Sequence, residues 1–282
     1  MPTATYPPTR VTANISFSIP PPDGVRAYQK VNVDPASGDL GRNTEREVKP
    51  VVIENLRGKE DQATLDTAGF QLFHRPTQHK GFTDDAAIER EYYPESIELI
   101  KEFTGASRVV LFDHTIRRRI PGESGSSPLK RQPVAQAHVD QSFKASIARV
   151  HRHLPAAEVP ALLQRRFQII NLWRPLSHPA VDWPLSVCDY RSVDREKDTF
   201  PVALVYDDRE GETLGVKYNP NQKWKYFHGM TPDEFVLIKC ADSIQDGSVA
   251  AFTPHTGFED PTTPEGTPPR ESIELRALVF YD

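Results

Sequence analysis

The sequence of 282 residues contains only two cysteines, Cys188 and Cys240, which lie far apart in the chain. A zinc site built from cysteines needs a closely spaced pair of them, so the sequence excludes such a site. A disulfide-based scaffold is also disfavoured by so low a count. Each cysteine lies in an apolar stretch, where a buried free thiol is the ordinary outcome.

Long apolar runs and an excess of one charge are also missing. No stretch approaches the ~18 apolar residues that a transmembrane helix requires, and residues 1–22 are rich in Pro and Thr without the apolar segment of a signal peptide. We therefore expect a cytoplasmic protein with no membrane partner. The net charge of −5 leaves no strong basic field, so we expect no nucleic-acid partner. The one dense basic segment, residues 117–131, fits either a solvated loop or a pocket mouth that attracts an anionic substrate.

Proline, by contrast, is abundant, with 26 residues that cluster in several places. Because proline interrupts helices and central strands, this frequency favours short strands joined by long loops. Residues 93–103 are the best helix candidate, with Pro94 in the first turn and Gly105 at the end. Residues 145–165 are expected to form two helical pieces separated by prolines.

Short strands are expected over most of the remaining chain. The predicted strands are residues 15–19, 49–56, 108–116, 167–173, 185–188, 202–206, 223–227, 234–239, 250–252 and 272–281. This pattern indicates a mainly β fold with flanking helices, either a barrel or a jelly roll. We expect a single domain over residues 1–282, with an extended N-terminal arm at 1–24 and the β core at roughly 108–282.

A histidine and a carboxylate lie two positions apart near the middle of the chain, at His138 and Asp140. On a strand these two positions project to the same face, so both side chains can bind one ion while Val139 faces the other layer. With a distant third histidine, this is the facial triad that binds non-haem Fe(II) and leaves three coordination positions open. His-x-Asp alone is a weak signal, because a surface ion pair gives the same pattern.

The third ligand is expected late in the chain, on a strand that lies near the first two. His255 directly follows a short apolar strand and is the better candidate, although a solvated loop histidine has the same local pattern. His228 precedes a turn at residues 230–234, which favours a surface position. We therefore expect His138, Asp140 and His255 to bind the metal.

An iron oxygenase of this kind also needs a cation for the distal carboxylate of 2-oxoglutarate, whose other end chelates the metal. Arginine suits this role because it stays charged and binds a carboxylate through two hydrogen bonds. The terminal strand contains Arg270 and Arg276, six positions apart and hence on one face. Arg276 lies in an apolar run and needs an anion, for which Glu274 is the simpler partner. Arg270 and the hydroxyl of Ser272 could equally bind one carboxylate, so both arginines stay candidates.

Five segments carry a resemblance to a known family. They are residues 138–142, 168–176, 184–189, 254–256 and 269–276. In this order they resemble the fungal gibberellin desaturase and cephem-methoxylase-related family, whose members are non-haem Fe(II)/2-oxoglutarate-dependent oxygenases of secondary metabolism. The resemblance extends from about residue 65 to the C-terminus.

This resemblance implies a double-stranded β-helix (jelly-roll) core, with Fe(II) as cofactor and 2-oxoglutarate and O2 as co-substrates. It makes His138, Asp140 and His255 the iron ligands. The residues expected to bind 2-oxoglutarate are Arg270, Arg276, Ser272 and Gln168, and those expected to bind substrate are Asn171, Trp173 and Arg174. On a regular strand, Arg174 points away from the other two substrate residues, and Asp189 is its alternative partner.

The predicted reaction is the oxidation of a C–H bond in a small molecule, coupled to conversion of 2-oxoglutarate to succinate and CO2. Hydroxylation, desaturation and oxidative cyclisation all remain open, because the outcome depends on how the substrate lies. A metal-dependent hydrolase on a cupin-like barrel would use the same ligands but leaves the terminal arginines unexplained. A non-catalytic binding protein predicts a broken triad, and no Gly-x-Ser-x-Gly elbow of a serine hydrolase is present. A monomer or homodimer is expected.

Overall fold

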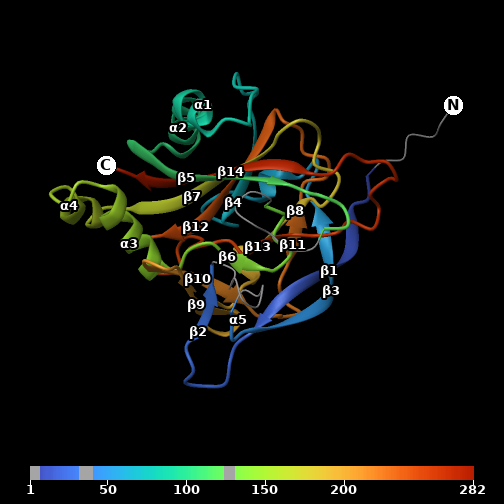
Figure 1. Cartoon of the computed structure of the whole chain (residues 1–282), viewed down its shortest axis with the longest axis horizontal. Coiled ribbons are helices and arrows are strands. Elements are labelled where there is room, and N and C mark those ends of the chain that lie inside the picture. Colours follow the sequence, from blue (N-terminus) through green and yellow to red (C-terminus); the bar gives the residue numbers. More distant parts are fainter. Residues whose placement is uncertain (1–6, 32–40, 124–130) are drawn as a thin grey trace.

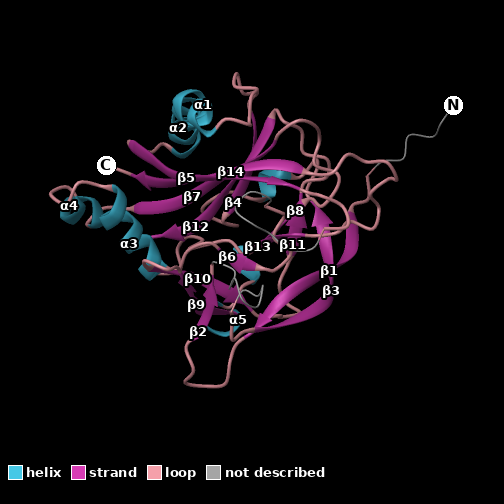
Figure 2. Cartoon of the chain, in the orientation of Figure 1, coloured by secondary structure: helices cyan, strands magenta, loops and turns pink. Residues whose placement is uncertain are grey.

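The structure, a computed structural model, describes residues 7–31, 41–123 and 131–282. Two β-sheets form the body of the protein, and short helices lie around them (Figure 1, Figure 2). This is the mainly β architecture with flanking helices that the sequence predicts. Among the described residues, no helix is long and apolar enough to cross a membrane.

The larger sheet contains nine strands. In spatial order they are β1 (Arg10–Ile19), β3 (Glu45–Asn55), β11 (Trp224–Tyr226), β8 (Leu185–Cys188), β13 (His255–Gly257), β6 (His138–Val139), β10 (Glu210–Val216), β9 (Thr199–Val205) and β2 (Ala27–Lys30). Neighbouring strands are antiparallel except for two parallel pairs, β11 with β3 and β2 with β9. The sequence analysis missed β2 and β10, which contain few large apolar residues.

The smaller sheet contains five antiparallel strands. In spatial order they are β4 (Phe70–His74), β12 (Glu234–Asp242), β7 (Phe167–Pro175), β14 (Glu271–Phe280) and β5 (Arg108–Arg118). The three central strands are long and almost wholly buried, because both faces of this sheet are covered. One face packs against helices, and the other faces the larger sheet (Figure 1).

The helices lie mainly against the smaller sheet. They are α1 (Asp85–Ala87), α2 (Tyr93–Thr104), α3 (Phe143–His153), α4 (Val159–Leu163) and α5 (Arg195–Asp198), with single helical turns η1 (Glu60–Gln62), η2 (Ile88–Tyr92) and η3 (Tyr190–Ser192). Helix α2 buries Leu99 and Ile100 against Leu172 of β7 and Leu275 of β14. Burying such a side chain contributes about 1.5–3 kcal/mol, so this apolar stripe anchors the helix.

The predicted ends of α2 are confirmed. Pro94 lies in the first turn, and Gly105 adopts a left-handed conformation with φ of 71° while its N–H donates to the Lys101 carbonyl at 2.9 Å. The predicted pair of helical pieces at 145–165 is also present, as α3 and α4. Pro160 does not break the second piece but lies in its first turn, where a missing N–H is tolerated.

The N-terminal region contributes to the sheets. Within the expected arm at 1–24, residues 10–19 form β1, which pairs along its whole length with β3. Its buried side chains alternate from Val11 to Phe17, which gives this strand an apolar inner face. Strands that precede residue 108 therefore belong to both sheets.

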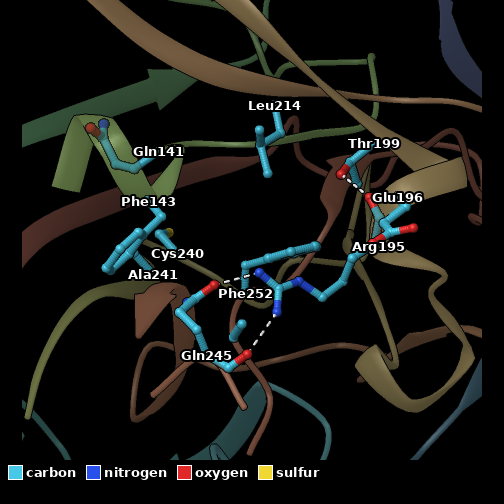
Figure 3. A pocket seen from close by; sticks show the side chains of 11 residues that line it. Gln141, Phe143, Arg195, Glu196, Thr199, Leu214, Cys240, Ala241, Gln245 and Phe252 are labelled. Atoms are coloured by element: carbon cyan, nitrogen blue, oxygen red, sulfur yellow. Dashed lines mark hydrogen bonds between the residues drawn. The ribbon is translucent and has the colours of Figure 1, made fainter. Parts of the chain in front are cut away.

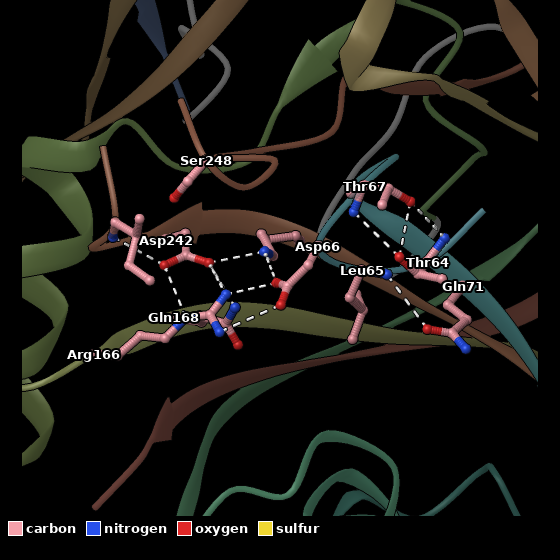
Figure 4. Close-up of polar contacts among 12 residues, drawn as sticks. Thr64, Leu65, Asp66, Thr67, Gln71, Arg166, Gln168, Asp242 and Ser248 are labelled. Atoms are coloured by element: carbon pink, nitrogen blue, oxygen red, sulfur yellow. Dashed lines mark hydrogen bonds and ion pairs between the residues drawn. The ribbon is translucent and has the colours of Figure 1, made fainter. Parts of the chain in front are cut away.

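A group of charges, buried at Lys239 and Asp242 and half-exposed at Asp66, joins the start of β7 to the end of β12 (Figure 4). Lys239 and Asp242 have no exposed surface, and Nζ of Lys239 lies 2.8 Å from Oδ2 of Asp242 and 2.8 Å from Oδ1 of Asp66. Arg166 also contacts both carboxylates, at 2.6 Å and 2.7 Å. Gln168 donates to Asp242 at 2.7 Å. Each charge therefore has the opposite charges that burial requires, and the group ties residues 63–69 to the smaller sheet.

Candidate metal centre

The three predicted metal ligands come together where the two sheets face each other. The strand register places His255 of β13 directly opposite His138 of β6, with their ring centroids 4.5 Å apart. Asp140 follows β6, and its Oδ1 lies 3.1 Å from Nε2 of His138 and 3.9 Å from Nε2 of His255. One ligand atom from each residue lies within 4.8 Å of the others, and no other group of metal-binding side chains among the described residues does so.

Both histidines are oriented by main-chain carbonyls. Nδ1 of His138 lies 2.8 Å from the carbonyl oxygen of Gln136, and Nδ1 of His255 lies 3.1 Å from that of Thr253. A nitrogen that contacts a carbonyl carries the proton, so Nε2 of each ring is left as an electron-pair donor. The two Nε2 atoms are those that point toward Asp140.

The Asp140 carboxylate uses its two oxygens differently. Oδ1 faces the histidines, whereas Oδ2 accepts hydrogen bonds from Nδ2 of Asn171 at 2.7 Å and from Nε of Arg276 at 3.0 Å. Burial alone would raise the pKa of Asp140, but the charges of Arg276 and the histidines hold it well below its usual value. Asp140 is therefore an anion with one oxygen free to bind a cation.

The surroundings of His255 differ from the sequence prediction. The expected strand at 250–252 is wrong: those residues lie in a buried loop, and His255 itself begins β13. The loop is held because Oγ1 of Thr253 donates to the Gly69 carbonyl at 2.5 Å. His228 lies outside the ligand group, and its ring centroid lies 6.2 Å from that of Tyr226.

Arg276 is engaged by acidic residues of the chain itself. Its Nη2 lies 2.6 Å from Oε1 of Glu274, and its Nη1 lies 3.2 Å from Oδ2 of Asp113. With the bond to Asp140, this guanidinium contacts three carboxylates. Burial alone would lower the pKa of Arg276, but these carboxylates raise it. Glu274, the simpler partner considered from the sequence, is thus one of its partners.

Arg270 has the opposite environment. It is 3% exposed, its Nη1 donates to the Trp183 carbonyl at 2.6 Å, and its guanidinium lies 5.6 Å from the ring centre of Trp173. Nε is buried and has no hydrogen-bond partner among the described residues. Burial lowers the pKa of Arg270, and the positive charge of Arg117 lowers it further. The charges of Asp182 and Glu274 oppose this lowering, and Asp182 accepts a hydrogen bond from the Arg270 main-chain N–H at 3.0 Å. The guanidinium itself, however, contacts no carboxylate among the described residues, so it is a buried cation without a directly paired anion.

The remaining expected residues of β7 and β14 divide between the two faces of the sheet. The cross-strand pairs Asn171–Arg276 and Trp173–Glu274 lie on the inner face with the ligand group, and Ser272 lies on the same face of β14. Arg174 and Gln168 lie on the other face, because side chains alternate along a strand. The structure therefore does not bring these two residues to the metal centre.

The partners of Arg174 and Gln168 explain their places. Arg174 is fully buried, and it donates to the Tyr92 hydroxyl at 3.0 Å and to the main-chain carbonyl of Pro232 at 2.7 Å. Its alternative partner Asp189 instead binds Arg191 at 2.6 Å. Gln168 belongs to the buried charge group described above.

Three residues of the inner face were not among the site residues expected from the sequence. Thr115 accepts hydrogen bonds from Arg276 and Arg131, both at 3.0 Å, and Arg117 lies opposite Ser272 across the strand pair. Cys240 lies in a bulge of β12. For Thr115 and Arg117, the sequence signal was that side chains at alternate positions of residues 113–117 share one face of a strand. Which face that is becomes clear only from the pairing of β5 with β14.

A cavity of about 430 Å³ lies near the predicted metal ligands, although none of the three lines it. Figure 3 shows the side chains of its wall. Gln141, which follows the ligand Asp140, and Cys240 form part of its wall, together with Phe143, Leu214 and Phe252. Burial raises the pKa of the Cys240 thiol well above its usual value, and the nearby charge of Asp140 raises it further. The cavity wall thus includes residues next to Asp140, one of the predicted metal ligands.

Comparisons with known proteins give consistent results. A family model described as "Oxidoreductase/YMDC permease-like domain" matches residues 15–280. The hydroxylase/desaturase efuI of Hormonema carpetanum is 36% identical over 255 residues, which cover 83% of this chain and 84% of that protein. The Fe(II)/2-oxoglutarate-dependent dioxygenase nvfI of Aspergillus novofumigatus is 32% identical over 273 residues, which cover 93% of this chain and 94% of that protein.

A solved structure resembles the whole chain. The iron and alpha-ketoglutarate-dependent endoperoxidase NvfI superposes with a TM-score of 0.82 at 29% sequence identity, covering 97% of this chain and 98% of that one. A match of this extent includes both sheets and the segments that carry the three predicted metal ligands. The predicted jelly-roll core is confirmed.

Proposed function

This chain belongs to the fungal family of Fe(II)/2-oxoglutarate-dependent hydroxylases, desaturases and endoperoxidases, and on that premise we propose that His138, Asp140 and His255 bind its iron. The observation that carries the proposal is the convergence of one donor atom from each residue within 4.8 Å. Two imidazoles and one carboxylate are the donor set of non-haem Fe(II) oxygenases, and they leave sites for a co-substrate and O2.

The hydrogen bonds behind the ligands support this role. The main-chain contacts of both Nδ1 atoms direct Nε2 toward a common point. Asn171 and Arg276 occupy Oδ2 of Asp140, so Oδ1 alone remains for the metal. Hydrogen-bonding partners behind the ligands fix the orientation of metal ligands in this way and strengthen their affinity.

When bound, iron and 2-oxoglutarate supply the activation of O2 and the oxidising power for a C–H bond, with succinate and CO2 as products. The chain orients these groups and keeps water away. Val187, opposite His255, and Ile238, opposite Asn171, are both at most 1% exposed, so buried apolar side chains pack beside the centre. Exclusion of water limits side reactions with solvent, so that oxidation of the substrate is favoured.

Arg270 is the proposed cation for the distal carboxylate of 2-oxoglutarate. Arg276 already contacts three carboxylates, whereas the guanidinium of Arg270 contacts none among the described residues and keeps an unpartnered Nε. Space beside Arg270 depends on Gly257, where a Cβ would lie 3.3 Å from Nη1. Ser272 lies between the two arginines on the same strand face and is 1% exposed, so its hydroxyl is a second proposed donor.

The substrate is proposed to be a small molecule of secondary metabolism that contacts Asn171, Trp173 and the cavity beside Cys240. Hydroxylation, desaturation and oxidative cyclisation are the reactions that this arrangement supports. The closer kinship with gibberellin desaturases and cephem methoxylases rests on the sequence motifs and is part of the proposal. A cytoplasmic location, a monomeric or homodimeric state and the lack of a nucleic-acid partner stay predictions from the sequence, as does a single-domain organisation.

The test is an anaerobic titration of the metal-free protein with Fe(II) and then 2-oxoglutarate, followed by the weak visible charge-transfer band of the chelate. We expect a band in the wild type and none in His138→Ala. Arg270→Gln should raise the 2-oxoglutarate concentration needed for half of the band by about tenfold or more, since hydrogen bonds to charged groups contribute about 1.5–3 kcal/mol.

Arg276→Gln serves as the comparison, because it removes the bond to Asp140 and should weaken Fe(II) binding instead. Binding of Fe(II) without a band would contradict the 2-oxoglutarate role and favour a metal-dependent hydrolase. Absence of metal binding would contradict the iron centre itself.

A further inference from the structure

We propose that Arg117 is a second cation of the 2-oxoglutarate site, so that the distal carboxylate is bound between the guanidinium groups of Arg117 and Arg270. This inference rests on the proposed function. It adds a residue of β5 to a site otherwise built from β14. It also gives a role to the first arginine of the basic segment at 117–131.

The strand register places Arg117 beside Arg270. Arg117 pairs with Ser272, and the antiparallel register continues beyond the strand, because the Arg119 N–H donates to the Arg270 carbonyl at 2.8 Å. Arg117, Ser272 and Arg270 therefore lie on one face, with the two arginines as diagonal neighbours. Diagonal Cβ atoms of such a pair are roughly 7–8 Å apart, a span that two long side chains can close around one ligand.

Arg117 is nearly free of partners. Within the part of the chain that the structure describes, its side chain has one hydrogen bond, from Nη1 to the Gln132 carbonyl at 2.9 Å, and no carboxylate there forms an ion pair with it. The neighbouring arginines differ: Arg118 lies 3.7 Å from Glu271, and Arg119 lies 2.8 Å from Asp182. Among the described residues of this region, Arg117, Arg270 and Arg131 are the arginines without an acidic partner, and Arg131 donates instead to the hydroxyl of Thr115.

Two guanidinium groups at this distance repel each other unless an anion lies between them. Burial lowers the pKa of Arg117, with Glu274 opposing and Arg276 adding to this effect, and the charge of Arg117 in turn lowers the pKa of Arg270. A carboxylate removes this repulsion and accepts hydrogen bonds from both groups. The anion that the proposed reaction brings to this face is the distal carboxylate of 2-oxoglutarate.

A purely structural role for Arg117 predicts something different. If Arg117 only holds Gln132 in place, its loss disturbs the loop and weakens the binding of every compound that chelates the metal to the same extent. If it binds the distal carboxylate, its loss affects only ligands that have one. 2-Oxovalerate has the same chelating end as 2-oxoglutarate with a methyl group in place of the distal carboxylate, so the two compounds separate the two roles.

The experiment compares the binding of both compounds to the anaerobic Fe(II)-loaded protein through the charge-transfer band. Arg117→Gln is expected to lower the affinity for 2-oxoglutarate about tenfold or more and to change the affinity for 2-oxovalerate less than twofold. Arg117→Lys, which keeps the charge, should recover part of the loss. Arg118→Gln is the matched control, since it removes an arginine whose side chain faces the opposite side of β5, and it should leave both compounds unaffected.

The combined variant Arg117→Gln/Arg270→Gln completes the test. A shared carboxylate predicts that the two losses are not independent, so the double variant should bind 2-oxoglutarate little better than 2-oxovalerate. Equal weakening of both compounds by Arg117→Gln, or no weakening of either, would overturn the inference. A wild-type protein without a band would instead overturn the proposed function, so the two failures are distinguishable.

Discussion

Asp140 shows how a single residue connects the two sheets. It follows a strand of the larger sheet, yet its Oδ2 is held by Asn171 and Arg276 of the smaller sheet. Asn171 is fully buried and neutral, so it can orient the carboxylate without competing with a metal for its charge. The position of the free oxygen therefore depends on packing between the sheets as well as on the His-x-Asp motif.

Replacement of Asn171 by alanine should weaken Fe(II) binding about tenfold, because loss of a partner behind a metal ligand costs about 10–100-fold in affinity. The measurement is an anaerobic Fe(II) titration by calorimetry. Asn221→Ala, which removes an exposed side-chain amide elsewhere, is the control and should bind Fe(II) like the wild type. Unchanged affinity in Asn171→Ala would show that Arg276 alone positions the carboxylate.

Strand β7 shows which features of an element the sequence reveals. Residues 167–173 were predicted as a strand, but every position of β7 is buried. A strand covered on both faces lacks the apolar–polar alternation that marks its inner side. Strand parity separated Arg174 from Asn171 and Trp173, but it could not show which of the two faces is the inner one. The sequence could not decide between Arg270 and Arg276 as the 2-oxoglutarate cation for a similar reason. The answer depends on which arginine is already paired with carboxylates from neighbouring strands.

Local signals, by contrast, predicted local structure well. Pro94 and Gly105 bound helix α2 because their backbone preferences act within one turn. The spacing of His138 and Asp140 likewise specified a common face. Residues 250–252, wrongly predicted as a strand, are apolar because other segments of the protein bury this loop. Burial by distant segments is the information that a short window of sequence lacks.

The buried charge group at the ends of β7 and β12 yields a prediction about stability (Figure 4). Lys239→Met should lower the free energy of unfolding at pH 7 by about 3 kcal/mol, because it leaves the buried Asp242 with fewer positive partners. Urea unfolding measures this loss. Lys197→Met, in an exposed pair with Asp194, is the control and should leave the unfolding curve unchanged.

The same group sets a pH dependence. Burial alone would raise the pKa values of Asp66 and Asp242, but Arg166 and Lys239 lower them below the usual value. Their stabilisation is therefore complete above the pKa of an unfolded aspartate, about 4, and is lost as the pH falls through the lower folded-state values. The difference between wild type and Lys239→Met should accordingly shrink below about pH 4, and a constant difference would contradict this origin.

At the scale of the whole molecule, the proposed site draws on both sheets, so its ligands should stabilise the entire fold. A ligand that binds only the folded chain at 100 times its dissociation constant adds about 2.7 kcal/mol to the free energy of unfolding. We expect Fe(II) to raise Tm under anaerobic conditions and 2-oxoglutarate to raise it further. In Arg270→Gln, Fe(II) should raise Tm as in the wild type, whereas most of the further rise with 2-oxoglutarate should be lost. Differential scanning calorimetry measures both changes in Tm.

The pairing of β6 with β13 has a consequence for the life of the protein. These strands have two and three residues and meet in a single pair, His138 with His255. So short a contact contributes few main-chain hydrogen bonds at the centre of a nine-stranded sheet. A metal ion held by both histidines acts there as a cross-link between β6 and β13. Iron supply would then govern how long each copy resists unfolding and proteolysis in the cell, in addition to how many copies can turn over substrate.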